Sequence, residues 1–180
     1  MKNNLSGTFS ELLDCFPIIE PPITLSGEVI TKFSSENPPI PGRLIAEYFS
    51  KWESIDEFTE FIPCLRFNNS KNYHALIYWK GGLMSYEYIL ISLSNKGEII
   101  SKKVIAGTLS NNQTIKESVA HIHTDYTIYS VVGESAVEDN TYKPLNSNSF
   151  HFSLLDDGSI ESIIEEENNT WEEEKEERKN

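Results

Sequence analysis

The pattern of hydrophobic and polar residues changes near position 58 of the chain. From there to position 164, short apolar stretches with a period of two residues alternate with turn-forming residues. Glu87, Ile89, Ile91 and Leu93 share one side of such a stretch, because successive side chains of a strand point to opposite faces. The pattern predicts eight strands, at residues 58–67, 73–79, 86–93, 98–106, 114–123, 126–132, 150–155 and 159–164.

Three links between these strands are short enough to form hairpins. Residues 95–97 and 156–158 each end in a glycine at the position where a positive φ is required, and residues 123–125 form a tight polar turn. Strands joined by hairpins form an antiparallel meander. The expected fold class is therefore mainly β, an antiparallel meander whose sheet is strongly curved or barrel-like, and its closure into a barrel stays open.

The N-terminal segment, residues 1–57, is expected to be helical and extended rather than part of the meander. Apolar positions with helical spacing predict a helix that ends at Pro17 and a second helix over residues 42–52. Between them, residues 23–33 predict one short strand. Short N-terminal helices therefore precede the sheet.

Two polar segments stand apart from the predicted strands. Residues 133–149 form a long polar connection, of a length that is usually functional or disordered. Residues 165–180 form an acidic tail, in which Thr170 and Glu173 have the spacing of a helix capping box. The chain is thus expected to be one β-rich domain, residues 1–164, followed by an acidic tail or helix.

Composition narrows the possible functions. The 180 residues include 15 basic and 28 acidic side chains, which gives a net charge of −13. This acidity argues against binding to nucleic acid or to an anionic membrane, because both require a basic face. Two cysteines are too few for a disulfide scaffold or a cysteine-based zinc site. No secretion signal or membrane-spanning stretch is recognisable, so we expect a cytoplasmic protein with Cys15 and Cys64 reduced.

Catalytic and metal-binding patterns are sparse. His121 and His123 share one side of a predicted strand, so both rings could reach one metal ion, with Asp125 following on the same side and His74 or His151 as a third ligand. The alternative, two histidines at the solvent end of a strand, is preferred. No nucleophile motif or phosphate-binding glycine loop is present. We therefore expect no catalytic residue, no metal site, no cofactor and no enzymatic activity.

Several sequence runs resemble a broad set of small, uncharacterised bacterial β-meander proteins. The runs are LLDCFPIIEP, YILISLSNKGEIISKKVIAG and HFSLLDDGSIES. In that set a helix ending in Phe-Pro leads into successive strands joined by Asp/Asn-x-Gly turns. The resemblance implies a β-meander fold and no particular activity or site residue.

The remaining candidates are binding residues. Tyrosines on an outward sheet face make good interface anchors, and a long acidic loop can contact a partner. The expected binding residues are Tyr86, Tyr88, Glu134, Glu138, Asp139 and Tyr142.

Three function classes stay open. The first is a non-catalytic protein-binding module of the inhibitor or immunity type that neutralises a basic protein partner. The second is a β-barrel that carries a small apolar ligand. The third, ranked last, is a metal-dependent hydrolase.

Overall fold

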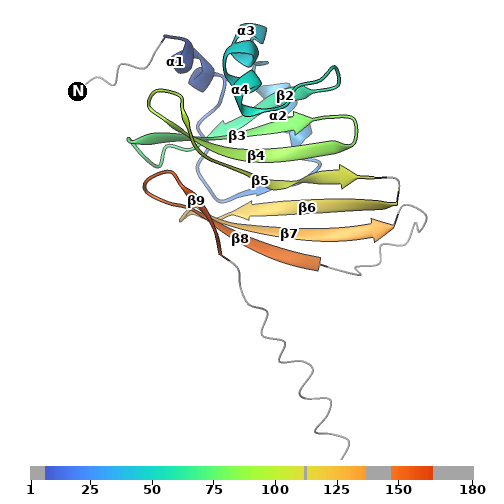
Figure 1. Cartoon of the computed structure of the whole chain (residues 1–180). Coiled ribbons are helices and arrows are strands. Elements are labelled where there is room, and N and C mark those ends of the chain that lie inside the picture. Colours follow the sequence, from blue (N-terminus) through green and yellow to red (C-terminus); the bar gives the residue numbers. More distant parts are fainter. Residues whose placement is uncertain (1–6, 112, 137–146, 164–180) are drawn as a thin grey trace, which may run out of the picture.

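Nine antiparallel strands form one sheet in the computed structural model, which describes residues 7–111, 113–136 and 147–163 (Figure 1). Strands β2 to β9 lie side by side in chain order, and β1 pairs with β6. The strands are β1 (Ile23–Leu25), β2 (Glu60–Arg66), β3 (Tyr73–Gly81), β4 (Ser85–Ser94), β5 (Ile99–Ser110), β6 (Thr114–Ile122), β7 (Thr127–Ala136), β8 (Ser147–Leu154) and β9 (Ile160–Ile163). Every strand predicted from position 58 onward is confirmed, and the fold is mainly β.

The sheet is open. Within the described part of the chain, β2 and β9 are its two ends and do not pair with each other. A closed barrel is therefore absent from these residues. The acidic tail expected at 165–180 lies outside the described residues.

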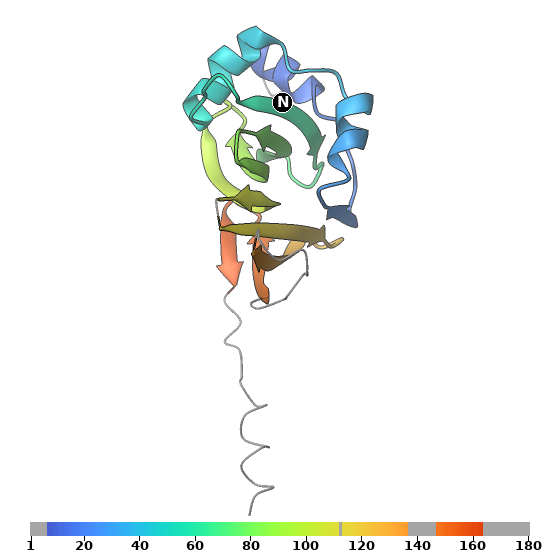
Figure 2. The ribbon, with the colours of Figure 1, turned by 90° about the vertical axis from the view of Figure 1, so that its right-hand side faces the viewer.

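Helices lie mainly before β2. They are α1 (Gly7–Asp14), α2 (Ile30–Glu36), and a continuous helical stretch of α3 (Gly42–Leu44), the π-helical η1 (Ile45–Phe49) and α4 (Ser50–Trp52). Both predicted helices are confirmed. α1 corresponds to the helix expected before Pro17, and the stretch from α3 to α4 corresponds to the helix expected over residues 42–52. In Figure 2 the helices gather around β2 to β4, and β7 to β9 project away from them.

The prediction of a single strand within residues 23–33 is wrong beyond Leu25, which is the last residue of β1. The chain forms only three residues of β1 and then turns into α2. Val29, Ile30 and Phe33 have helical spacing. In the structure they pack on the face of the sheet that β1 and α2 cover, which we call the inner face. The strand preference of β-branched residues was outweighed by this burial.

Both faces of β3 and β4 are buried, in two separate hydrophobic cores. On the outer face, Leu76, Tyr78 and Ile89 pack against Phe9 of α1 and Phe49 of η1. The inner core uses the alternate positions of the same strands, extends along β5 to β8, and is covered by β1 and α2. This double coverage explains why these strands read as nearly continuous apolar runs.

The predicted hairpin turns are formed. Gly97 and Gly158 have φ values of 82° and 88°, the left-handed conformation that the turns require. The turn after β6 extends one residue further than predicted, since Tyr126 takes a φ of 63° and its N–H bonds to the carbonyl oxygen of His123.

Strands β5 and β6 separate over part of their length. They pair only where residues 107–110 of β5 face residues 115–118 of β6. Beyond this, β1 occupies the edge of β6 instead, with Leu25 opposite Ala120. Among the described residues, no helix is both long and apolar enough to cross a membrane.

Candidate functional site

Of the two tyrosines of β4 that were expected to bind a partner, only Tyr86 is available at the surface. Tyr88 is 1% exposed and its hydroxyl donates to the carbonyl oxygen of Ser26, so it is a core residue. Ile89 and Ile91 point to the opposite face of β4 from Tyr86 and Tyr88. Tyr88 belongs to the inner core and the isoleucines to the outer one, because β4 is covered on both faces.

Of the four binding residues expected in the 133–149 connection, the structure describes only Glu134. Glu134 is half-buried within β7, opposite Lys116 of β6. Glu138, Asp139 and Tyr142 lie outside the described residues. The predicted connection at 133–149 is shorter than expected, since β7 continues to Ala136 and β8 begins at Ser147, where the two strands still pair.

Three of the four histidines lie in one row with Tyr129. The ring of His121 lies 4.6 Å from that of His123, and Tyr129 lies between His123 and His151, at centroid distances of 4.9 and 4.0 Å. His74 is remote from them and packs against Phe9. Asp125 accepts the backbone N–H of Thr127 within the turn. Across the described ranges, no three His, Cys, Asp or Glu side chains are placed to hold a metal ion.

The surface with the clearest binding character is one end of the sheet, where three separate segments meet. The first residue of β2, Glu60, pairs with the last of β3, Gly81, and the backbone N–H of Ser110 at the end of β5 bonds to the oxygen of Met84. Figure 1 shows the turn before β2, the β3–β4 turn and the end of β5 at the same end of the molecule. We call this surface the apolar end, after its exposed residues Ile55, Phe58, Leu83, Met84, Tyr86 and Leu109.

These side chains are unusually accessible for large hydrophobic residues. Leu83 is 67% exposed, Leu109 54% and Phe58 51%. Single exposed apolar residues are ordinary on protein surfaces, but a group at one end of a sheet indicates a contact surface. The apolar end is therefore the candidate binding site.

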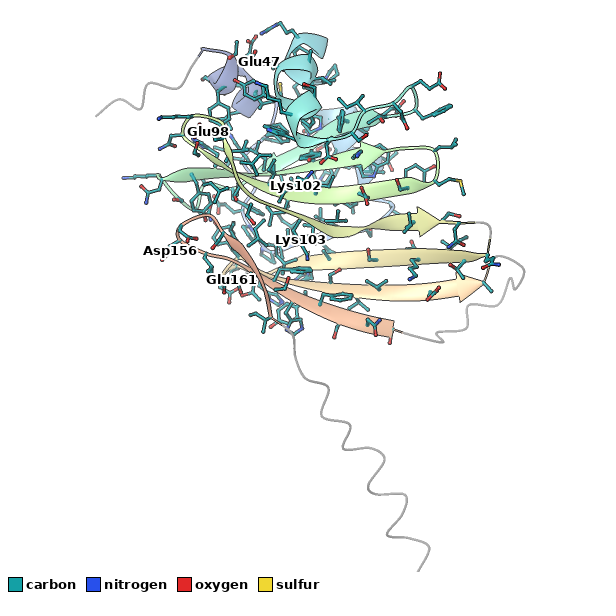
Figure 3. All side chains as sticks on the ribbon, in the orientation of Figure 1. Glu47, Glu98, Lys102, Lys103, Asp156 and Glu161 are labelled. Carbon is teal, nitrogen blue, oxygen red and sulfur yellow. The ribbon has the colours of Figure 1, made fainter. Side chains whose placement is uncertain are left out.

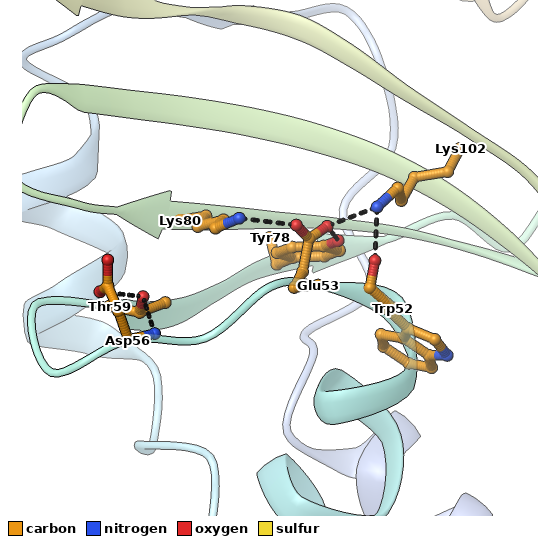
Figure 4. Close-up of polar contacts among 7 residues, drawn as sticks. All are labelled: Trp52, Glu53, Asp56, Thr59, Tyr78, Lys80 and Lys102. Atoms are coloured by element: carbon orange, nitrogen blue, oxygen red, sulfur yellow. Dashed lines mark hydrogen bonds and ion pairs between the residues drawn. The ribbon is translucent and has the colours of Figure 1, made fainter.

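A buried carboxylate holds the segment that leads into the apolar end (Figure 4). Glu53, whose side chain is 7% exposed, accepts hydrogen bonds from the hydroxyl of Tyr78 at 2.5 Å and from the amines of Lys80 and Lys102 at 2.8 Å each. Lys102 also donates to the backbone oxygen of Trp52 at 2.6 Å. The end of α4 is thereby fixed to β3 and β5.

The charge of Glu53 is favoured in this setting. Burial alone raises the pKa of the Glu53 carboxyl, but the hydrogen bonds from Lys102, Lys80 and Tyr78 outweigh it, and the pKa lies below its ordinary value. Burial and the neighbouring carboxylate raise the pKa of Tyr78. Glu53 is therefore ionised and Tyr78 neutral at physiological pH, so the carboxylate accepts the hydrogen bond that the Tyr78 hydroxyl donates.

The next turn is fixed by Asp56. Its carboxylate accepts a hydrogen bond from the backbone N–H of Phe58 at 3.0 Å. It also accepts one from the hydroxyl of Thr59 at 2.7 Å (Figure 4). The Thr59 hydroxyl and the Phe58 N–H lower the pKa of Asp56. This side-chain turn presents Ile55, Glu57 and Phe58 to solvent in a defined arrangement.

Tyr86 is positioned by stacking. Its ring lies 5.6 Å from that of Trp79, with an angle of 9° between the planes. The Trp79 ring lies over Gly81, where an added Cβ would come within 2.5 Å of the indole. Glycine at position 81 is what lets the indole lie flat against the strand and support Tyr86.

Acidic residues lie along the β2 to β4 side of the apolar end, whereas Lys116 of β6 lies opposite Leu109. Asp56, Glu57, Glu60 and Glu87 lie on the same turns and strand ends, while the nearby Lys80 is bound to Glu53. An apolar centre with an exposed charged rim is the usual anatomy of a protein interface. This arrangement can take up a partner that is itself apolar and basic.

Sequence reasoning missed Ile55, Phe58, Leu83, Met84 and Leu109. Phe58 was assigned to a strand, and Leu83 and Met84 fell between two predicted strands, directly after Gly81 and Gly82. The available signal was the position of Leu83 and Met84 directly after these glycines, because turns usually carry polar residues. Leu109 lay beyond the predicted end of its strand.

No protein-family model matches the chain, and no match was found among the curated proteins or among the solved structures. The functional interpretation of the apolar end therefore depends on its geometry and charge.

Proposed function

We propose that the protein is a non-catalytic binding module that recognises a basic protein partner through the apolar end. The observation that carries the proposal is the grouping of six exposed hydrophobic side chains on turns and strand ends at one end of the sheet, with acidic residues along the β2 to β4 side. Buried aromatic and aliphatic anchors supply most of the binding free energy of a protein interface, and rim charges supply orientation.

The partner's positive charge follows from electrostatic complementarity. The net charge of −13 attracts a basic protein over a distance and repels an acidic one. The acidic residues beside the apolar end also oppose an anionic bilayer, so a protein suits this surface better than a membrane. Neutralisation of a basic partner, as by an inhibitor or immunity protein, is the functional class that this proposal specifies.

The proposal includes a cytoplasmic location and a steering role for the acidic tail. Cys15 and Cys64 are both free and buried, as suits a reducing compartment. Residues 165–180 contain eight acids and three bases, so that 3 − 8 gives −5 for the tail. That charge would accelerate association with a basic partner.

We infer further that the sheet is strongly curved. The β8–β9 hairpin returns to β4 and β5, where the Ser92 hydroxyl donates to the oxygen of Gly158 at 2.5 Å and the Ile160 N–H donates to the Ser101 hydroxyl at 3.2 Å. The metal-dependent hydrolase is not proposed, because the described residues bring no third ligand to His121 and His123.

The test compares partner capture by two variants with matched exposure. Leu109→Thr removes an anchor of the apolar end, and Val131→Thr removes an equally exposed residue, also 54%, on the outer face of β7. The wild type and each variant are immobilised separately and exposed to lysate of the source cells. Calorimetry then measures the affinity of any recovered protein for the wild type and for each variant.

The proposal predicts a recovered protein of high isoelectric point, which Leu109→Thr weakens by about 1–2 kcal/mol and Val131→Thr leaves unchanged. Thermal unfolding of both variants provides the control for folding. A partner that is acidic, or one whose affinity responds only to Val131→Thr, would contradict the proposal.

A further inference from the structure

A groove lies where β5 and β6 separate, next to the part of β5 that does not pair with β6. Residues 102–106 of β5 form one wall, Phe150 and Phe152 of β8 the opposite wall, and Ser118, Ser130 and Val132 the floor. Its volume is about 510 Å³, within the range of sites that hold small ligands. None of its lining residues belongs to the apolar end, although Val104 and Ala106 of the groove border Tyr86 and Leu109.

The walls of the groove are largely apolar. Val104, Ile105 and Ala106 face the two phenylalanines across it. Phe150 is 46% exposed and Val104 47%, so an occupant would remove substantial apolar surface from water. On the floor, Ser130 is 4% exposed.

One cation is available at the groove. Of the two lysines on its β5 wall, Lys102 directs its amine to Glu53 and Trp52 on the helix side. The amine of Lys103 instead lies 5.1 Å from the centre of the Phe152 ring. Within the described residues no carboxylate lies within ion-pair distance of Lys103, although Glu161 projects from the neighbouring hairpin strand (Figure 3).

We propose that this groove binds an amphiphile with one anionic headgroup and an extended apolar body, such as a long-chain carboxylate. The apolar body lies between β5 and the phenylalanines of β8, and the headgroup meets Lys103. A neutral ligand would leave the cation without a counter-charge, and a cationic ligand would be repelled by it. The amine of Lys103 lies beside an apolar surface, which complements a ligand with one negative charge and an apolar body.

Calorimetric titration with decanoate, decanol and decyltrimethylammonium, each below its micelle concentration, tests the proposal on the full chain. We expect decanoate to bind most tightly. Lys103→Met should weaken decanoate about twofold to fivefold, as expected for a solvent-accessible ion pair, and leave decanol unchanged. The matched control is Lys32→Met, on the exposed side of α2 and remote from the groove.

A second variant, Val132→Trp, fills the groove and should abolish binding of both decanoate and decanol. Unfolding curves and the calorimetric response are recorded on the same samples, so a misfolded variant is recognised, and Val132→Phe then replaces it. Decanol binding as tightly as decanoate, decanoate binding that persists in the groove-filled variant, or no decanoate binding up to millimolar concentration would overturn the proposal. A dimer that dissociates in the groove-filled variant would overturn it too, because a second copy of the chain would then occupy the groove.

Discussion

Replacing Glu53 by glutamine tests the structural basis of the apolar end. The substitution keeps the size of the side chain and an oxygen that Tyr78 can donate to, but removes the negative charge shared with Lys80 and Lys102. Because Glu53 fixes the end of α4 to two strands, its charge should contribute measurably to the free energy of unfolding.

The expected loss is about 2 kcal/mol. A hydrogen bond to a charged group contributes roughly 1.5–3 kcal/mol and a neutral one roughly 0.5–1.5, so each of the three contacts loses about 1 kcal/mol. The side chains of Lys80 and Lys102 are 20% and 34% exposed, so water recovers part of this when the carboxylate is gone.

The pH dependence of the loss has a definite sign. The pKa of Glu53 in the folded state lies below the ordinary value of 4.5. The stability contributed by its charge is thus complete above that ordinary value and is lost as the pH falls through the folded-state pKa. The difference between wild type and Glu53→Gln should therefore be largest at pH 7 and shrink in acid.

Urea unfolding followed by tryptophan fluorescence at pH 7 and in acid measures both quantities. The control is Glu57→Gln, a neighbouring exposed carboxylate, which should change stability by less than about 0.5 kcal/mol. A Glu53→Gln variant as stable as the wild type at pH 7, or equally destabilised at both pH values, would refute this reasoning.

Two further predictions concern other parts of the chain. Gly81→Ala should lose about 1–3 kcal/mol in urea unfolding, because its Cβ would collide with the Trp79 ring, whereas Gly82→Ala, whose Cβ meets no atom closer than 3.5 Å, should lose much less; equal losses would contradict the assigned packing. A chain ending after Ile164 should keep nearly the same melting temperature but associate more slowly with a basic partner, and stopped-flow kinetics should show the difference fading at high salt. A large loss of thermal stability, reproduced by Trp171→Ala alone, would instead assign the tail a structural role.

The sequence predicted the strands well because their signal is local. Period-two alternation and glycine turns depend on neighbouring residues, and β4 and β8 appear within a few residues of their expected bounds. The error at α2 arose where two local signals conflicted. There Val29, Ile30 and Phe33 favour a strand by composition and a helix by spacing, and only packing on the inner core decides.

The candidate site was much less predictable, because it is assembled from distant segments. Glu53 and Lys102 are 49 positions apart, and no local pattern pairs them. The apolar end similarly combines Phe58, Leu83 and Leu109 from three segments. Tyr88 illustrates the opposite error, because alternation alone cannot show that both faces of a strand are covered.

Hydrogen–deuterium exchange of the protein with and without its basic partner tests the central claim most directly. The account predicts that backbone protection on binding is concentrated in residues 55–59, 82–86 and 109–110, at the apolar end. Protection confined to the outer face of β7 and β8, with these three segments unchanged, would contradict it.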